Sequence, residues 1–156
     1  MMVPILLQKH LVDEVLPKIF EGTKFLNTDN EKVNINFYKQ YLPKKKKDID
    51  IFPFVNVILL DGEEQSKDTA NTAHILFMVG VYDEDENNQG YQDSIIILNK
   101  IYQHLREKEL FDSKYVIDYP VKWMTNDDVT YPYFYSALET NWEVAKVLQT
   151  NENLYS

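Results

Sequence analysis

Cysteine is absent from the 156 residues of this chain, and its only arginine is Arg106. The absence of cysteine excludes a disulfide framework, a thiolate metal site and a cysteine nucleophile. Specific nucleic-acid binders rely on arginine for bidentate contacts, whereas this chain has a formal net charge of −9. We therefore expect that the chain does not bind a phosphate backbone. We interpret the one basic run, Lys44 to Lys47, as a solvated loop. DNA could still pass such an acidic surface, because like charges repel.

Glycine is also scarce, and long apolar runs are missing. Four glycines leave little room for a phosphate-binding loop, and no Gly-x-Gly-x-x-Gly or Gly-x-Ser-x-Gly motif occurs. The apolar start of the chain ends at Gln8 and has no basic residues before it. It is too short for a signal sequence or a membrane span. We therefore expect a protein that is made in the cytoplasm, without a membrane segment.

The three histidines predict no metal site. His10, His74 and His104 are scattered, and none forms a His-x-x-x-His pair. A zinc site would need several ligands that converge from such distant positions. Ordinary surface histidines are the simpler interpretation.

An acidic run resembles the start of a calcium-binding loop but fails at its decisive positions. Asp83, Asp85 and Asn87 would be loop positions one, three and five. An EF-hand then requires glycine at position six and a bidentate acid at position twelve, where this chain has Asn88 and Ser94. A solvated turn before a helix is the better interpretation.

Neighbouring carboxylates occur at Asp61 and Glu63, at Glu63 and Glu64, and at Asp127 and Asp128. With 25 acids in the chain, such pairs arise from composition alone. A paired-acid catalyst also needs two carboxylates at a defined separation across one cleft. We therefore name no catalytic, cofactor-binding or metal-binding residue.

The composition is that of a globular protein, with 44% hydrophobic and 26% charged residues. The length suits one domain with a substantial core. We find no internal repeat and no linker, so we predict a single domain over residues 1–156. Residues 149–156 are polar, and we expect them to form a frayed tail.

Two amphipathic helices are predicted, over residues 3–20 and 90–108. In the first, Pro17 should kink or shorten the last turn, and Gly22 is a plausible stop. In the second, Asn88 is a reasonable N-cap. The stripe expected to face the core of the second helix consists of Tyr91, Ile95, Leu98, Ile101, Tyr102 and Leu105, and Ile96 and Ile97 add to it.

Alternating or continuous apolar residues predict five strands. They cover residues 33–42, 54–60, 75–82, 115–124 and 133–148. Gly80 is expected to mark a bulge or a close packing contact, and Pro120 an edge strand or a bulge. Asp61-Gly62 reads as a turn, followed by a polar loop over residues 63–72. The last strand exceeds the usual length, so we expect it to bend or to project beyond the domain.

Aromatic residues gather around the last two predicted strands. Two interpretations stay open: an assembly surface, because tyrosine and tryptophan are enriched at interface cores, or packing between strands of the last hairpin. The residues concerned are Trp123, Tyr131, Tyr133, Phe134, Tyr135 and Trp142.

The order of several segments resembles a known family. Phe52 to Glu63 is a strand ending at Asp-Gly, a polar loop leads to Ile75 to Asp83, and Gly90 to Asp93 opens a long helix. Val121-Lys122-Trp123 and Tyr133-Phe134-Tyr135 follow, the latter with Glu139, Asn141 and Trp142. In this order the chain is similar to the tail terminator, or head–tail joining, proteins of long-tailed bacteriophages.

The resemblance implies an α+β subunit, with a mixed, mainly antiparallel sheet of about four to five strands and two helices packed on one face. It implies a structural protein of the virion tail or neck, and no enzyme. Copies would form a homo-oligomeric ring, usually a hexamer, that ends the tail tube. The implied partners are the major tail tube protein and a head-completion or connector protein. DNA would pass through the lumen without specific binding, and no cofactor is implied.

Two other functions fit parts of the sequence. The first is an acidic immunity or inhibitor protein that masks a basic toxin, which the net charge of −9 suggests. The second is a small hydrolase that uses Asp61, Glu63 and His74.

Overall fold

The computed structural model describes residues 4–44, 46–87, 89–108, 110–126 and 128–144. Its helices are α1 (Ile5–His10), the π-helical η1 (Leu11–Val15), α2 (Leu16–Ile19), α3 (Asp48–Ile51) and α4 (Gly90–Glu107). Its strands are β1 (Lys24–Leu26), β2 (Lys32–Asn34), β3 (Asn36–Lys39), β4 (Phe54–Glu63), β5 (Asn71–Tyr82), β6 (Tyr115–Thr125) and β7 (Tyr133–Val144). Residues 149–156, the predicted frayed tail, lie outside the described residues.

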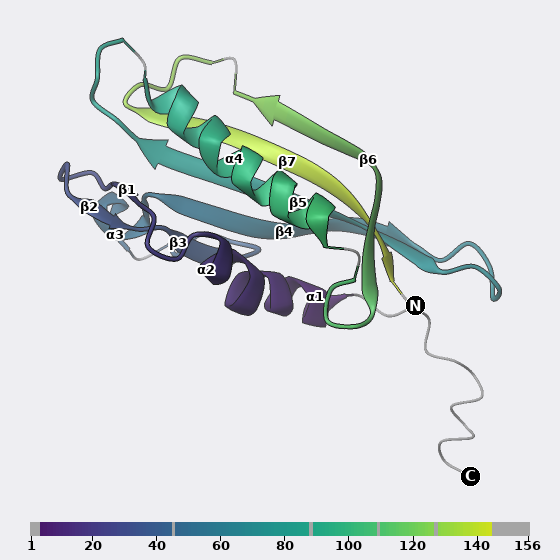
Figure 1. The fold of residues 1–156 in the computed structure, drawn as a ribbon. Helices are drawn as coiled ribbons and strands as arrows, with labels where there is room; N and C mark the ends of the chain where they lie inside the picture. The colour runs from purple at the N-terminus through teal and green to yellow at the C-terminus, as the bar shows by residue number, and fades with distance from the viewer. Residues whose placement is uncertain (1–3, 45, 88, 109, 127, 145–156) are drawn as a thin grey trace.

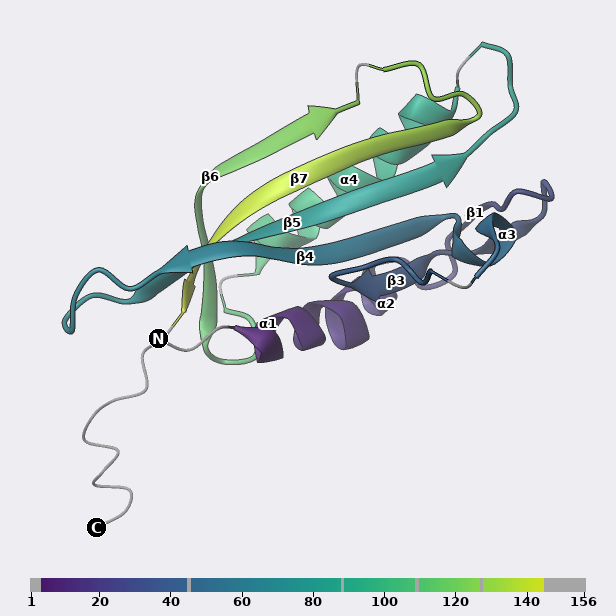
Figure 2. The ribbon, with the colours of Figure 1, turned by 180° about the vertical axis from the view of Figure 1, so that it is seen from behind.

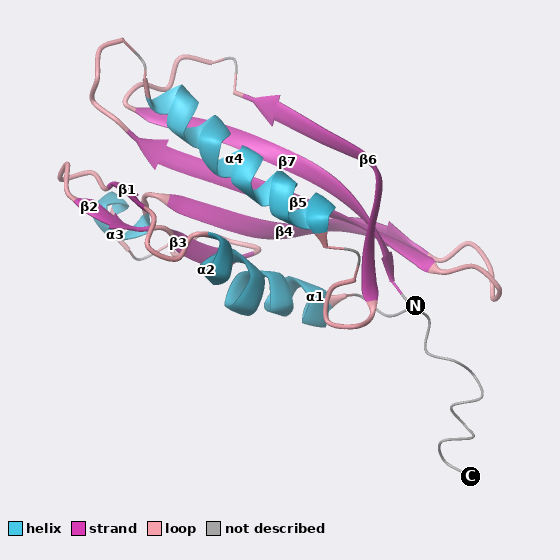
Figure 3. Ribbon diagram, in the orientation of Figure 1, coloured by secondary structure: helices cyan, strands magenta, loops and turns pink. Residues whose placement is uncertain are grey.

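The fold is α+β, as predicted. Five strands form one mixed sheet in the order β3-β4-β5-β7-β6, and β1 and β2 form a separate antiparallel pair. Within the main sheet β3 and β4 are parallel, and the other neighbours are antiparallel. The continuous helix α1–η1–α2 and helix α4 cover the same face of this sheet (Figures 1 and 3). Seen from behind, no long helix among the described residues covers the other face, and the short α3 lies at one end of it (Figure 2).

The N-terminal helix runs from Ile5 to Ile19 and accommodates its proline with a π-helical turn. Pro17 has no N–H, so it cannot continue the hydrogen-bond ladder. Just before it, the Leu16 N–H bonds the Leu11 carbonyl, five residues back. The kink predicted at the proline is therefore a local widening of the helix into one π-helical turn. The helix ends before Gly22, which has a φ of 76°.

The single strand predicted over residues 33–42 is wrong, because the chain forms two strands in different sheets. Lys32–Asn34 pairs with β1, whereas Asn36–Lys39 pairs with β4. Ile35 is buried at the junction. Alternation indicates extended backbone in both parts, but tertiary contacts decide which partner each part finds.

The turn predicted at Asp61-Gly62 is also wrong. Strand β4 continues through both residues to Glu63, with a register shift between Leu59 and Asp61. Gly62 faces Ala73, and a Cβ added to Gly62 would lie 2.7 Å from the Thr72 carbonyl oxygen. The glycine therefore serves close backbone pairing rather than a turn. The connecting loop shortens to residues 64–70.

The main core lies between the sheet and its helices. It contains fully buried side chains from β5, α4 and β7, including Phe77, Ile101 and Trp142. A second cluster lies on the opposite face of the sheet, where Phe52, Phe54 and Tyr82 are buried. A strand buried on both faces was predicted for residues 75–82. Within it, residues 79–82 are buried without a break, whereas residues 75–78 alternate between buried and half-buried.

Helix α4 begins at Gly90, and its N-cap position is occupied by Gln89; the predicted cap, Asn88, lies outside the described residues. The predicted stripe is partly wrong, because Tyr91 and Tyr102 are exposed. The helix packs on β5 and β7, so the flank that carries both tyrosines meets no strand of the core. The buried side of the helix consists of Gly90, Ser94, Ile97, Leu98, Ile101 and Leu105.

The two predictions about strand irregularities are confirmed. Strand β6 is an edge strand, and its register against β7 shifts between Asp118 and Lys122, around Pro120. Gly80 is a close packing contact, because an added Cβ would lie 2.2 Å from the Phe54 ring. Strand β7 is described as far as Val144, so the rest of the long strand predicted to residue 148 lies outside the described residues.

Candidate assembly surface

An apolar groove of about 720 Å³ lies between helix α4 and edge strand β6. It exists because α4 packs over β5 and β7, which leaves the helix-side face of β6 uncovered. The groove, hereafter the α4–β6 groove, is lined by Tyr91, Ile95, Leu98, Asn99, Tyr102, Val121, Trp123, Thr125 and Leu138.

Trp123 is the most unusual residue of this groove, because 66% of it is exposed. It lies opposite Leu138 of β7, which is buried in the core, so both side chains project from the helix side of the sheet. Leu138 is covered by α4, whereas Trp123 lies one strand further out. Across the groove, Tyr102 is 39% exposed. Contiguous exposed aromatic surface of this kind marks an interaction site more often than chance exposure.

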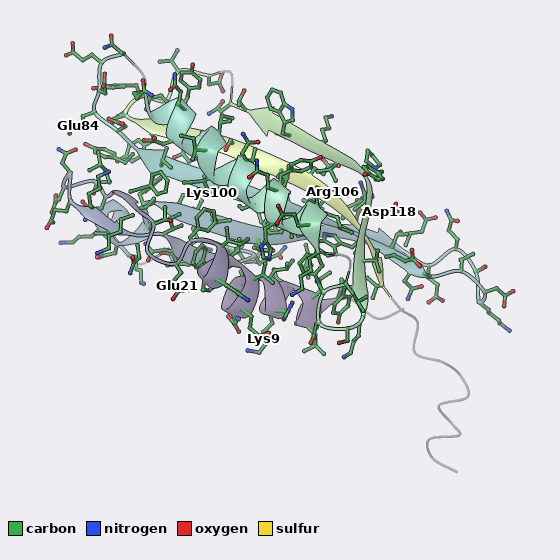
Figure 4. The ribbon with its side chains drawn as sticks, in the orientation of Figure 1. Lys9, Glu21, Glu84, Lys100, Arg106 and Asp118 are labelled. Atoms are coloured by element: carbon green, nitrogen blue, oxygen red, sulfur yellow. The ribbon has the colours of Figure 1, made fainter. Side chains whose placement is uncertain are left out.

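Arg106 lies in the last turn of α4, four residues after Tyr102 of the groove. Its guanidinium carbon lies 4.1 Å from the ring centroid of Tyr119 on β6, and its Nη2 donates a hydrogen bond to the Tyr119 hydroxyl. Figure 4 marks Arg106 here and Asp118 on the neighbouring part of β6. The second guanidinium nitrogen, Nη1, is buried and has no hydrogen-bond acceptor among the described residues. A buried donor without an acceptor costs about 1–3 kcal/mol.

At the other end, the groove continues into a smaller pocket beneath the loop between β6 and β7. This pocket has a volume of about 270 Å³ and shares Tyr91 and Thr125 with the groove. Val129, on the same loop, is 95% exposed. The apolar surface therefore extends along α4 from Tyr102 to this loop.

The six aromatic residues around the last two strands fall into two groups: four pack within the subunit, and two are exposed. Trp142 is in the main core, and Tyr133 and Tyr135 pack in the second cluster with Phe52. Phe134 packs against Gly90 at the start of α4. Packing within the subunit is therefore confirmed for these four. Of the six, Trp123 and Tyr131 are exposed.

Strands β4 and β5 end in the projecting loop of residues 64–70 (Figures 1 and 2). This loop and the adjoining residues 60–63 and 71–74 are hereafter the arm, in which β5 is also paired with β7 as far as Asn71. Asp61 and His74 face each other on this arm, and Nδ1 of His74 contacts the Asp61 carboxylate. Both are well exposed, and Glu63 lies opposite Thr72, where its carboxylate accepts a hydrogen bond from Gln65. The structure thus brings together two of the three residues considered for a hydrolase. This contact links two neighbouring strands on an exposed surface, and it does not lie in a cleft that could hold a substrate.

The acidic run after β5 forms a hydrogen-bonded turn. The Asp83 carboxylate accepts from the Asp85 N–H, and the Asp85 carboxylate accepts from the Asn87 N–H. Glu84 accepts from the Tyr82 hydroxyl, which raises the pKa of Tyr82 to about 12 and lowers the pKa of Glu84. Asn30 donates a second bond to Glu84 and adds to this lowering. The hydrogen bonds of these three carboxylates order the loop between β5 and α4.

The other two histidines lie on different helices, His10 on α1 and His104 on α4. His10 contacts Glu14 one turn later on the N-terminal helix, and burial is the largest cause that lowers the pKa of His104. Within the part of the chain that the structure describes, no three side chains of His, Cys, Asp or Glu are arranged to hold a metal ion. In the same residues, no helix is both long and apolar enough to cross a membrane.

Sequence reasoning missed the α4–β6 groove, although one signal for it was present. The apolar positions on α4 extend over more of the helix surface than one sheet face can bury, and Val121 and Trp123 alternate on a strand expected at an edge. Together these facts indicate an apolar helix flank beside an apolar strand face.

No family model matches this chain, and no curated protein matches it.

Proposed function

We propose that this chain is a structural subunit that assembles with copies of itself into a ring of six at the end of a phage tail tube. The observation that carries the proposal is the α4–β6 groove, with Trp123 66% exposed beside an edge strand. A stable monomer rarely leaves such a surface uncovered. The α+β fold, with two helices on one face of a mixed sheet, also agrees with what the resemblance to tail terminator proteins implies.

The positions of the groove and the arm favour a ring over a two-fold dimer. The groove lies between α4 and β6, whereas the arm is the continuation of β4 and β5. Contacts between two different surfaces of identical subunits are head-to-tail, and they close into a ring when the rotation allows. In the virion such a ring would join the major tail tube protein to the head connector.

The charge of the chain suits a ring through which DNA passes. The net charge is −9, and carboxylates such as Glu63, Glu64, Asp85 and Glu86 are exposed. An acidic lumen repels the phosphate backbone, so DNA slides without being held. Neither specific DNA binding nor a cofactor is part of this proposal.

The same exposed acids favour one alternative, an inhibitor that masks a basic toxin. Such a protein would bind its target one to one, and added salt would weaken the complex by slowing association. It would stay monomeric in the absence of its target. The inhibitor and the ring therefore differ in their behaviour as isolated chains.

The test of the proposed function is the growth of tail tubes. Tubes of the major tail protein from the same phage are assembled with and without this chain, and their lengths are measured by electron microscopy. We expect the chain to stop elongation, and a ring to be visible at one end of each stopped tube. Tubes of unchanged length with bare ends would contradict the proposal.

A further inference from the structure

Given the proposed ring, we infer that the C-terminal segment of one copy, residues 145–156, docks in the α4–β6 groove of the next copy. In this contact Leu154 and Tyr155 pack against the exposed ring of Trp123. The inference identifies the segment that covers the groove. It rests on the proposed self-assembly and would fall with it.

The groove favours an apolar occupant. None of the residues that line it is charged, and seven of them are aliphatic or aromatic. Apolar side chains laid on this surface remove apolar area from water on both partners. A charged segment would instead lose hydration there without gaining a partner of opposite charge.

The segment of residues 145–156 supplies such an occupant. It contains two apolar pairs, Val147-Leu148 and Leu154-Tyr155, with the polar residues 149–153 between them. The loop of residues 64–70, by contrast, has Ala70 as its only apolar residue. The sequence therefore favours the C-terminal segment over the arm as the part of a neighbouring copy that enters the groove.

This segment is long enough to join two copies. Leu154 comes ten residues after Val144, where strand β7 ends, and ten extended residues span up to about 33 Å. The 18 residues of α4 span about 27 Å. The reach of the segment thus exceeds the length of the helix that borders the groove.

The point at which the segment leaves the fold favours the groove of another copy over the groove of its own. Val144 pairs with the arm on one side and with Tyr115, at the start of β6, on the other. Further along β6, Tyr119 contacts Arg106 of α4. A segment that turned back would have to cross this contact before it reached its own groove. Docking on the next copy instead brings the arm end of one subunit to the groove of another, a head-to-tail contact that can close into a ring.

Disulfide trapping tests the contact directly, because the chain has no cysteine of its own. In the double variant Asn99→Cys/Asn153→Cys, the first position lines the groove and the second lies next to the docked pair. Mild oxidation is expected to link neighbouring copies into dimers and higher multiples on a non-reducing gel. The control is Glu21→Cys/Asn153→Cys, whose first position is exposed outside the groove, and it should give no such multiples (Figure 4). A disulfide within one chain, or none, in the groove variant would overturn the inference.

Native mass spectrometry measures the effect of each side of the contact on assembly. The tail variant Leu154→Asp/Tyr155→Asp and the groove variant Trp123→Asp are each expected to need at least about tenfold higher concentration to form rings, because each loses buried apolar side chains. The control Thr150→Asp/Asn151→Asp adds the same charge in the polar stretch and should assemble like the wild type. Circular dichroism checks that all three variants fold.

An equimolar mixture of the tail variant and the groove variant should give a one-to-one dimer that grows no further, since one intact tail meets one intact groove. Rings formed by either variant at the concentration that suffices for the wild type, or a mixture that stays monomeric, would overturn the inference and leave the ring proposal standing. A monomeric wild type would overturn both.

Discussion

Trp142→Ala is expected to lower the free energy of unfolding by about 3–5 kcal/mol, the range for a large aromatic side chain removed from a core. Trp142 is 1% exposed, and its ring packs edge-on against Phe111 with centroids 5.2 Å apart. Its indole N–H donates to the Thr140 hydroxyl at 2.7 Å, and that hydroxyl donates to the Ile75 carbonyl. The substitution leaves a cavity and removes one bond of this buried chain. Urea unfolding followed by circular dichroism measures the loss.

The second tryptophan provides the matched control for this prediction. Trp123 lies on the neighbouring strand but is exposed, so Trp123→Ala should change the free energy of unfolding of the monomer by about 0.5 kcal/mol or less. The difference between the two losses in free energy of unfolding tests which tryptophan is part of the core and which lies on the surface. Equal losses for the two variants would contradict the placement of Trp123 outside the core.

Gly80→Ala is expected to destabilise the protein by about 1–3 kcal/mol through overpacking. The new methyl group would lie 2.2 Å from one carbon of the Phe54 ring and 2.5 Å from another. Phe54 is fully buried and packs against Phe52, so it has little space to move. In an open site the same substitution stabilises a protein by about 0.4–1 kcal/mol, because alanine restricts the unfolded chain. The sign of the change therefore reports the close contact, and chemical denaturation measures it.

A double-mutant cycle separates this clash from a general effect on strand β5. Phe54→Leu removes the ring that the methyl group meets, so Gly80→Ala should cost less in that background. A coupling of at least about 0.5 kcal/mol is expected. If the two losses simply add, the contact between positions 54 and 80 is not the cause.

The sequence predicted the fold class because its periodic patterns are strong where one face of an element is buried. Helix α4 and strands β4 to β7 were all expected close to their observed ranges. Errors arose where local chemistry and tertiary pairing disagree. Asp61-Gly62 has the composition of a turn, yet pairing with β5 holds it in a strand. Likewise, the alternation across Ile35 could not show that the chain passes from one sheet to another.

The candidate assembly surface was harder to predict than the fold. Trp123 and Trp142 both lie on predicted strands, and the sequence around them does not show which of the two is buried. Their difference depends on where α4 lies across the sheet, which is decided by packing between distant segments. Arg106 stood out as the only arginine, but its partner on β6 and its unpaired Nη1 depend on the same packing. The arm, by contrast, was visible as a polar segment between two apolar strands.

The molar mass of the intact chain in solution tests the central claim of self-assembly most directly. Size-exclusion chromatography with multi-angle light scattering, over a series of concentrations, gives this mass without a partner or a substrate. We expect a single species whose mass is six times that of the 18.5 kDa subunit, or another fixed multiple of it. A mass of one subunit at every concentration would contradict it.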